Sequence, residues 1–205
     1  MRALILVDLQ YDFMPGGALA VARGDETVAI ANRLMPYFPT VVATQDWHPA
    51  NHKSFAVNNP GTNVFDVIDL QGAPQVMWPA HCVQDTRGAE LHADLDRARI
   101  TEVFRKGTDP EIDSYSGFFD NGHKKATGLG AWLRERWIEQ VYVLGLATDY
   151  CVKFTALDAL GLGMKVMLVE DGCRTVDRVP GDGDRAIAEL RGRGAAIIES
   201  GAVGA

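Results

Sequence analysis

Residues 144–153 read Leu144-Gly145-Leu146-Ala147-Thr148-Asp149-Tyr150-Cys151-Val152-Lys153, and the rest of the chain can be interpreted around them. The apolar residues just before it predict a buried strand, which we expect Gly145 to end. Thr148 is suited to cap the helix that follows, so Cys151 would lie in the first helical turn. Free N–H groups and the positive end of the helix dipole favour a thiolate there. The stretch therefore predicts an elbow that carries a nucleophilic cysteine and oxyanion donors, the alternative being a cysteine that only packs.

The composition is that of an ordinary globular protein. The chain has 205 residues, of which 47% are hydrophobic and 23% are charged, so we expect one domain over residues 1–205. A net charge of −7 argues against nucleic acid or an anionic membrane as the main partner. No apolar run is long enough to span a bilayer, and because the N-terminus enters a predicted strand at once, we expect no signal peptide. The three cysteines, Cys82, Cys151 and Cys173, suit a reducing cytoplasm better than a disulfide scaffold.

Apolar strand-like runs alternate with helical periodicity along the chain. This alternation predicts an α/β fold with a doubly wound, mostly parallel sheet that has helices on both faces. Residues 58–81 show little periodicity, which is typical of a functional loop or an insertion. The strands are expected at residues 3–7, 40–44, 102–105, 141–144, 165–169 and 195–198, and the helices at residues 25–38, 126–137, 148–160 and 185–190.

Four chemically useful residues each follow a predicted strand: Asp8, Asp46, Lys106 and Cys151. Taken alone, a carboxylate in a loop or a solvated lysine would need no functional explanation. Because the carboxyl ends of parallel strands lie at one edge of a sheet, all four side chains are expected to meet there. Their convergence favours a catalytic role for Cys151 over simple packing.

A second group of residues has the character of a metal site. Asp46 and His48 are two residues apart in extended backbone, so both side chains can point to one side. His81 lies at the end of residues 58–81, and the chain can return there to supply a third ligand. His52 lies near His48 in sequence. Two histidines and one carboxylate with open positions are typical of a catalytic metal site. We interpret Cys82, which neighbours His81, as a packing residue.

At this point the chain resembles the nicotinamidases (pyrazinamidases) of the isochorismatase-like hydrolase superfamily. The resemblance covers nearly the whole chain except its Gly- and Arg-rich end. It rests on Val7-Asp8-Leu9-Gln10 with Phe13 and Gly16-Gly17-Ala18-Leu19, Thr44-Gln45-Asp46-Trp47-His48-Pro49, Trp78-Pro79-Ala80-His81-Cys82, Arg105-Lys106-Gly107, Asp113-Ser114-Tyr115-Ser116-Gly117-Phe118 and Gly145-Leu146-Ala147-Thr148-Asp149-Tyr150-Cys151-Val152.

The resemblance implies a three-layer fold around a six-stranded sheet and a catalytic triad of Asp8, Lys106 and Cys151. It also implies a cis peptide between Leu146 and Ala147, with the N–H groups of Ala147 and Cys151 holding the oxyanion.

The resemblance further implies one divalent metal ion, either zinc, iron or manganese. Asp46, His48 and His81 would be its ligands, and His52 matches a further metal-site histidine of some members. The implied substrate-binding residues are Phe13, Leu19, Trp78, Tyr115, Ala147 and Tyr150.

The implied activity is hydrolysis of nicotinamide to nicotinate and ammonia through a thioester at Cys151, in NAD salvage. The ion would orient the pyridine ring, pyrazinamide would be a second substrate, and the protein would be a monomer or a small homo-oligomer.

Other functions fit these residues less well. Another cysteine amidohydrolase of the superfamily, acting on carbamoyl-amines or ureido acids, would share the triad but usually lacks the metal set. A nucleotide-binding module is disfavoured because Gly161-Leu162-Gly163 follows a predicted helix rather than a first strand. A noncatalytic binding protein on the same fold would have no need of Asp8, Lys106 and Cys151 together.

Overall fold

A six-stranded parallel sheet forms the centre of the computed structural model, which describes residues 1–204. All five neighbouring strand pairs are parallel, in the order β5-β2-β1-β6-β7-β8. This architecture confirms the predicted doubly wound α/β fold. The strands are β1 (Arg2–Val7), β2 (Val41–Asp46), β5 (Glu102–Lys106), β6 (Gln140–Leu146), β7 (Lys165–Arg174) and β8 (Ala196–Ile198).

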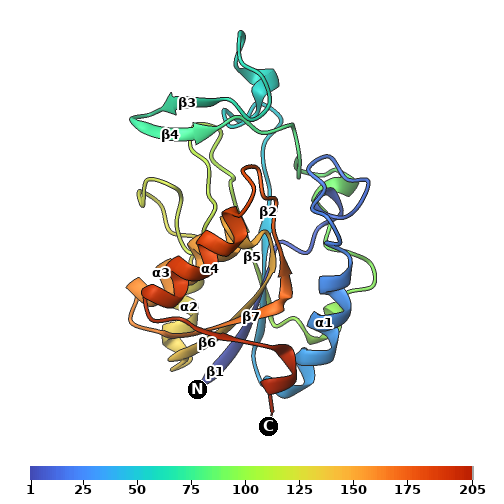
Figure 1. The fold of residues 1–205 in the computed structure, drawn as a ribbon, viewed down its shortest axis with the longest axis vertical. Coiled ribbons are helices and arrows are strands. Elements are labelled where there is room, and N and C mark those ends of the chain that lie inside the picture. The colour runs from blue at the N-terminus through green and yellow to red at the C-terminus, as the bar shows by residue number, and fades with distance from the viewer. Residues whose placement is uncertain (205) are drawn as a thin grey trace.

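Helices cover both faces of this sheet, which gives the three predicted layers (Figure 1). The chain moves outward from β1 to β2 and β5, and then returns past β1 to β6, β7 and β8. Because right-handed crossovers in opposite directions place their helices on opposite faces, α1 lies on one face and α2, α3 and α4 on the other. The helices are α1 (Glu26–Leu34), α2 (Leu129–Glu135), α3 (Lys153–Gly161) and α4 (Asp182–Gly192). Within residues 1–204, every helix is too short or too polar to cross a membrane.

Strand β1 lies at the centre of the sheet and is buried on both faces. Leu4, Ile5 and Leu6 are all 0% exposed, since β1 lies between β2 and β6 and has helices above and below. Burial of one such side chain stabilises the fold by about 1.5–3 kcal/mol. The continuous apolar run that predicted this strand is therefore the sequence of a strand covered on both faces.

Strand β6 runs on to Leu146, so the prediction that Gly145 ends it is wrong. Gly145 has a φ of +130°, and a Cβ placed there would lie 2.1 Å from the backbone oxygen of Val7. Glycine at this position thus lets β1 and β6 approach closely instead of breaking the strand. Strand β7 is also longer than predicted and ends at Arg174, beyond the expected end at residue 169.

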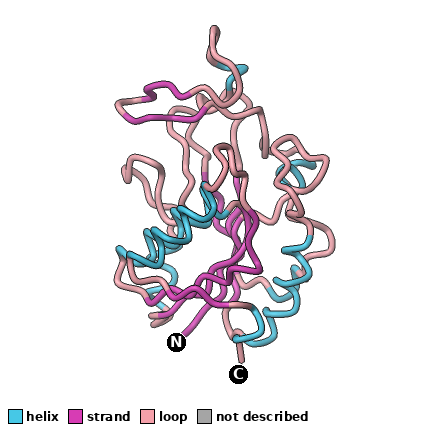
Figure 2. The backbone as a smooth tube through the Cα atoms, viewed as in Figure 1, coloured by secondary structure: helices cyan, strands magenta, loops and turns pink. Residues whose placement is uncertain are grey.

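Residues 47–101 connect β2 to β5 without an α-helix, and we call them the excursion. It contains a short antiparallel hairpin of β3 (Val67–Leu70) and β4 (Ala73–Val76), within the stretch that showed little periodicity. Figures 1 and 2 show that the hairpin and the neighbouring loops lie beyond the carboxyl ends of the parallel strands. The excursion therefore covers the edge of the sheet where the sequence predicts the active site.

Candidate active site

The structure brings the carboxylate of Asp8, the amine of Lys106 and the thiol of Cys151 together at the carboxyl edge of the sheet. Asp8 follows β1, Lys106 ends β5 and Cys151 follows β6. Lys106 Nζ lies 2.9 Å from Asp8 Oδ2 and 3.3 Å from Cys151 Sγ. It also lies 2.6 Å from Asp46 Oδ1 and donates a hydrogen bond of 3.0 Å to the Ser114 backbone oxygen. One buried ammonium group thus bridges two carboxylates and the thiol.

The Asp8 carboxylate has one oxygen fixed and one oxygen free to accept a proton. Thr44 Oγ1 donates a hydrogen bond of 2.6 Å to Asp8 Oδ1. Asp8 Oδ2 forms the ion pair with Lys106 but accepts no well-aligned hydrogen bond from any residue among 1–204. A carboxylate oxygen of Asp8 lies within 4.8 Å of Cys151 Sγ. Asp8 is therefore placed to take the thiol proton, and Thr44, which the sequence analysis did not single out, holds it in place.

Burial favours the protonated form of the Cys151 thiol. Burial raises the pKa of the Cys151 thiol well above its usual value, and the charge of Lys106 offsets this only in part. Burial also raises the pKa of Asp8. Burial alone would lower the pKa of Lys106, but the charges of Asp46 and Asp8 outweigh it and raise that pKa. A thiolate would add a third negative charge around one cation, so burial opposes the thiolate that the helix start favours, and a neighbouring base is needed to remove the proton.

The turn that carries Cys151 differs from the predicted helix start. Residues Thr148–Val152 form one π-helical turn, and α3 begins only at Lys153. Within residues 1–204, the Thr148 side chain caps no helix, and the residue before the turn is Ala147. The prediction that Thr148 caps the helix is therefore wrong. The Ala147 backbone oxygen instead accepts the N–H groups of Tyr150 and Val152, both at 3.1 Å.

The peptide bond that enters this turn, between Leu146 and Ala147, is cis. Asp149 then connects the turn to the loop after β7, because its carboxylate accepts the N–H groups of Val176 and Asp177 at 3.0 and 2.9 Å. Val176 thereby reaches the same site as Cys151.

Asp46, His48 and His81 present three donor atoms to one point. Asp46 Oδ2 lies 3.5 Å from His48 Nε2 and 3.8 Å from His81 Nε2. The other ring nitrogens are engaged, since His48 Nδ1 lies 2.9 Å from the Gly107 oxygen and His81 Nδ1 lies 2.8 Å from the Pro79 oxygen. These contacts turn both Nε2 atoms toward Asp46. A buried set of one carboxylate and two imidazoles at these separations fits a divalent metal ion.

The pKa values of the two histidines shift in opposite directions. Burial, with the charge of His48, lowers the pKa of His81 to about 4, which leaves its ring neutral and able to bind a metal. Burial would lower the pKa of His48 as well, but Asp46 outweighs it and raises that pKa.

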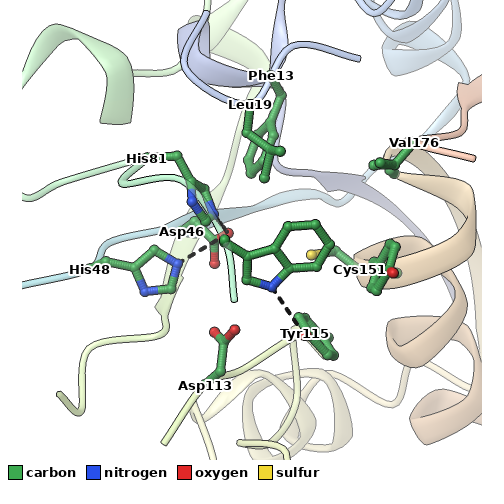
Figure 3. Close-up of a pocket in the computed structure, with 12 residues that line it drawn as sticks. Phe13, Leu19, Asp46, His48, His81, Asp113, Tyr115, Cys151 and Val176 are labelled. Atoms are coloured by element: carbon green, nitrogen blue, oxygen red, sulfur yellow. Dashed lines mark hydrogen bonds and ion pairs between the residues drawn. The ribbon is translucent and has the colours of Figure 1, made fainter. Parts of the chain in front are cut away.

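His52 lies beside this set but belongs to a second group of potential ligands with His48 and Asp113. The rings of His52 and His48 are 4.4 Å apart, and His52 Nδ1 lies 2.8 Å from Ser54 Oγ. The Asp113 carboxylate accepts a hydrogen bond of 3.1 Å from Gln75 Nε2 and faces the pocket (Figure 3). Asp113 had no predicted role, because its motif shows an acidic residue but not what faces it.

A pocket of about 350 Å³ opens beside Cys151 and the three potential metal ligands (Figure 3). Trp78 packs edge-on against Tyr150 at 4.8 Å, and its Nε1 donates a hydrogen bond of 3.1 Å to the Tyr115 hydroxyl. The residues that line the pocket include all six that the sequence predicts to bind substrate, together with the unpredicted Asp113 and Val176. They are Phe13, Leu19, Asp46, His48, Trp78, His81, Asp113, Tyr115, Ala147, Tyr150, Cys151 and Val176.

Known proteins share both this sequence pattern and this fold. The isochorismatase domain family matches residues 2–202. The chain is 52% identical to the nicotinamidase of Escherichia coli (strain K12), over 96% of this chain and 93% of the relative. A solved nicotinamidase/pyrazinamidase of Acinetobacter baumanii is 46% identical, with a TM-score of 0.95 over 98% of this chain and 96% of that one. A pyrazinamidase of Pyrococcus horikoshii, solved in complex with zinc, is 39% identical, with a TM-score of 0.79 over 97% and 98% of the two chains.

Proposed function

Because this chain belongs to the isochorismatase family and is an amide hydrolase that converts nicotinamide to nicotinate, we propose that it acts through a thioester at Cys151. The observation that carries this proposal is the position of Lys106 Nζ, 2.9 Å from Asp8 Oδ2 and 3.3 Å from Cys151 Sγ. A thiol and a carboxylate base that contact the same cation are the parts that nucleophilic catalysis requires.

Asp8 acts first as a base and then as an acid. Its carboxylate takes the proton of the Cys151 thiol while Sγ attacks the amide carbon, and it returns that proton to the departing ammonia. A water molecule then attacks the thioester carbon, with Asp8 again accepting a proton. Nicotinate leaves and the proton on Asp8 restores the thiol. Lys106 stays protonated throughout and balances the charge of Asp8.

We propose that the oxyanion of each tetrahedral intermediate lies against the N–H groups of Ala147 and Cys151. The π-helical turn supports this assignment, because it places Cys151 directly after the end of β6, as in a nucleophile elbow. A single donor of this kind lowers the barrier by about 2.7–4 kcal/mol.

Asp46, His48 and His81 would hold one divalent ion, with zinc supported by the Pyrococcus relative and iron or manganese as the other candidates. When bound, the ion supplies a coordination partner for the pyridine nitrogen, directly or through water. Trp78, Tyr115 and the other apolar residues of the pocket would hold the flat ring. His52 ranks below these three as a ligand because it is not grouped with Asp46. Its buried Nε2 has no hydrogen-bond partner within residues 1–204, so it stays a candidate for a further bond.

The same site suits pyrazinamide, which differs from nicotinamide by one ring nitrogen in place of a CH group. The metal set disfavours the alternative of a carbamoyl-amine or ureido-acid amidohydrolase, because such substrates have no ring nitrogen to bind. We further propose that residues 1–205 act as one cytoplasmic domain, as a monomer or small homo-oligomer without nucleic-acid or membrane partners. The single six-stranded sheet and the three unpaired cysteines support this view.

Ammonia release from nicotinamide, measured before and after treatment with a chelator and after zinc is restored, tests the proposed chemistry. Rapid-quench mass spectrometry should find a nicotinoyl group on Cys151 during turnover. Hydroxylamine should trap the same acyl group. Full turnover with no acylated enzyme at any time would instead point to direct attack by water.

A further inference from the structure

Asp12 lies outside the pocket, yet its carboxylate joins two parts of the pocket wall. It is in the short 3-10 turn Tyr11–Phe13, directly before the wall residue Phe13. Asp12 Oδ2 accepts the backbone N–H of Cys82 at 2.7 Å, across a separation of 70 residues. Cys82 directly follows His81, one of the three potential metal ligands. A single hydrogen bond to a carboxylate therefore links the first loop of the chain to the end of the excursion that carries His81.

Gly88 encloses the same carboxylate from the other side. A Cβ added at Gly88 would lie 2.1 and 2.4 Å from the two Asp12 carboxylate oxygens and 2.3 Å from the carbon between them. The carboxylate thus rests directly on the Gly88 backbone while it binds the Cys82 N–H group. Gly88 has no need of glycine for its own backbone angles, since it is not among the residues with positive φ. The contact with Asp12 is the reason that this position excludes a side chain.

Asp12 also fixes the loop in which it lies. Its backbone oxygen accepts the N–H of Leu19 at 3.0 Å, and Oδ1 accepts the N–H of Ala18 at 3.3 Å. Phe13 and Leu19 both line the pocket, and the Phe13 ring packs at 5.5 Å against the His81 ring, with the ring planes 61° apart. Asp12 therefore supports both the apolar wall formed by Phe13 and Leu19 and the segment that carries His81.

We propose that Asp12 is a positioning residue that fixes His81 relative to the wall formed by Phe13 and Leu19. It acts through the N–H of Cys82 and touches neither the thiol nor the pocket. Groups that support metal ligands in this way typically contribute 10- to 100-fold to metal affinity. The inference rests on the proposed metal site, because its effect passes through His81.

The test compares Asp12→Ala, Asp12→Asn and Asp94→Ala with the parent protein. The Asp94 side chain is 84% exposed, which makes its replacement a matched control for the loss of one carboxylate. Zinc affinity, measured by competition with a chromophoric chelator, should fall about 10- to 100-fold in Asp12→Ala. The KM for nicotinamide should rise in parallel, while kcat in excess zinc stays within about threefold, since the triad is untouched. Asp12→Asn should recover most of the affinity, because its amide oxygen can still accept the Cys82 N–H.

Gly88→Ala provides a second, independent disruption of the same contact. Alone, it should weaken zinc binding in the same direction as Asp12→Ala. In the Asp12→Ala background, Gly88→Ala should lower zinc affinity no further, because the new methyl group fills the space that the carboxylate leaves. Zinc affinity and KM unchanged in Asp12→Ala, or an equal loss from Gly88→Ala in both backgrounds, would overturn the inference. A parent protein that binds none of zinc, iron and manganese would instead overturn the proposed metal site and this inference with it.

Discussion

The reacting groups and the substrate pocket are built in different ways. Asp8, Asp46 and Lys106 lie at the ends of three neighbouring strands, and Asp46 and Lys106 are direct partners in the register of β2 and β5. The walls of the pocket come instead from loops, among them the loop after β1 and the excursion. The distances that chemistry requires are thus set by sheet hydrogen bonds, whereas the shape and polarity that select the substrate are set by segments that can vary.

This contrast predicts a division in kinetic effects. Loss of a triad group, Asp8, Lys106 or Cys151, should reduce kcat, because it removes an interaction made in the transition state. Loss of a group in the walls or the metal set should act on metal affinity and KM first. The following experiments test that division.

The largest effect is expected from Cys151→Ala, which removes the proposed nucleophile. The value of kcat should fall at least about 10⁴-fold, because activity without a nucleophile rests on binding and oxyanion donors alone. Circular dichroism and thermal unfolding should match the parent, since alanine fits the space of the buried thiol. Turnover within tenfold of the parent would show that Cys151 does not carry the reaction.

Replacing the substrate probes the metal set without altering the protein. Benzamide has the shape of nicotinamide but no ring nitrogen, so a site that binds this atom is left unsatisfied. We expect kcat/KM for benzamide to be lower by at least about 10³-fold, since an apolar pocket alone discriminates only about 10- to 200-fold. Steady-state kinetics of both amides with zinc-loaded enzyme measure this ratio. Similar values would indicate a general aromatic amidase.

His48→Ala and His81→Ala each remove one of the three proposed ligands. Zinc affinity should fall at least about 100-fold in both variants, because two remaining donors make a poor site. Metal analysis after dialysis against a weak chelator provides the measurement. His92→Ala is the matched control, as that histidine lies outside the potential metal groups. Full metal content in both variants would refute the ligand assignment.

Tyr115→Phe should have a moderate effect confined to the wall. The Tyr115 hydroxyl accepts hydrogen bonds of 3.1 Å from Trp78 Nε1 and from Gln75 Nε2. Without it, buried donors lose a partner, which costs about 1–3 kcal/mol of unfolding free energy. We expect KM to rise about tenfold while kcat changes less than about threefold. A loss confined to kcat would contradict the division between strand ends and walls.

The smallest effect is expected from Cys173→Ser. This buried thiol lies 3.3 Å from the Val169 backbone oxygen, a contact that a serine hydroxyl can also make. Both kcat and KM should stay within about twofold of the parent, because the side chain only packs. Steady-state kinetics check this, and a larger loss would show that Cys173 supports the neighbouring Cys151 turn.

Much of the fold was predictable because it depends on local patterns. The continuous apolar run of β1 and the alternation of strands and helices identified a parallel sheet, and residues after strand ends identified the site. Gly145 was misinterpreted because the close approach of Val7 is a contact between strands that are far apart in sequence. The β3–β4 hairpin escaped notice because its strands are only four residues long.

The protonation of the site was harder to predict than the residues that form it. The helix start around Cys151 suggested a thiolate, but the pKa depends on how deeply the folded chain buries the thiol. Thr44, Asp113 and Val176 were missed because each reaches the site through contacts with distant residues. The chemistry of a side chain can be read from the sequence. The part that these three residues play depends instead on where the fold places them.

The excursion has a consequence for how such enzymes diversify. It leaves the sheet after β2 and returns at β5, and on the way it contributes Trp78 and His81 to the pocket. Substitutions, insertions or deletions within it can change the ring-binding half of the site while Asp8, Lys106 and Cys151 keep their places on other segments. Natural selection, or a designer, can therefore exchange this one segment as a module and obtain an amidase for a different acyl group on an unaltered catalytic framework.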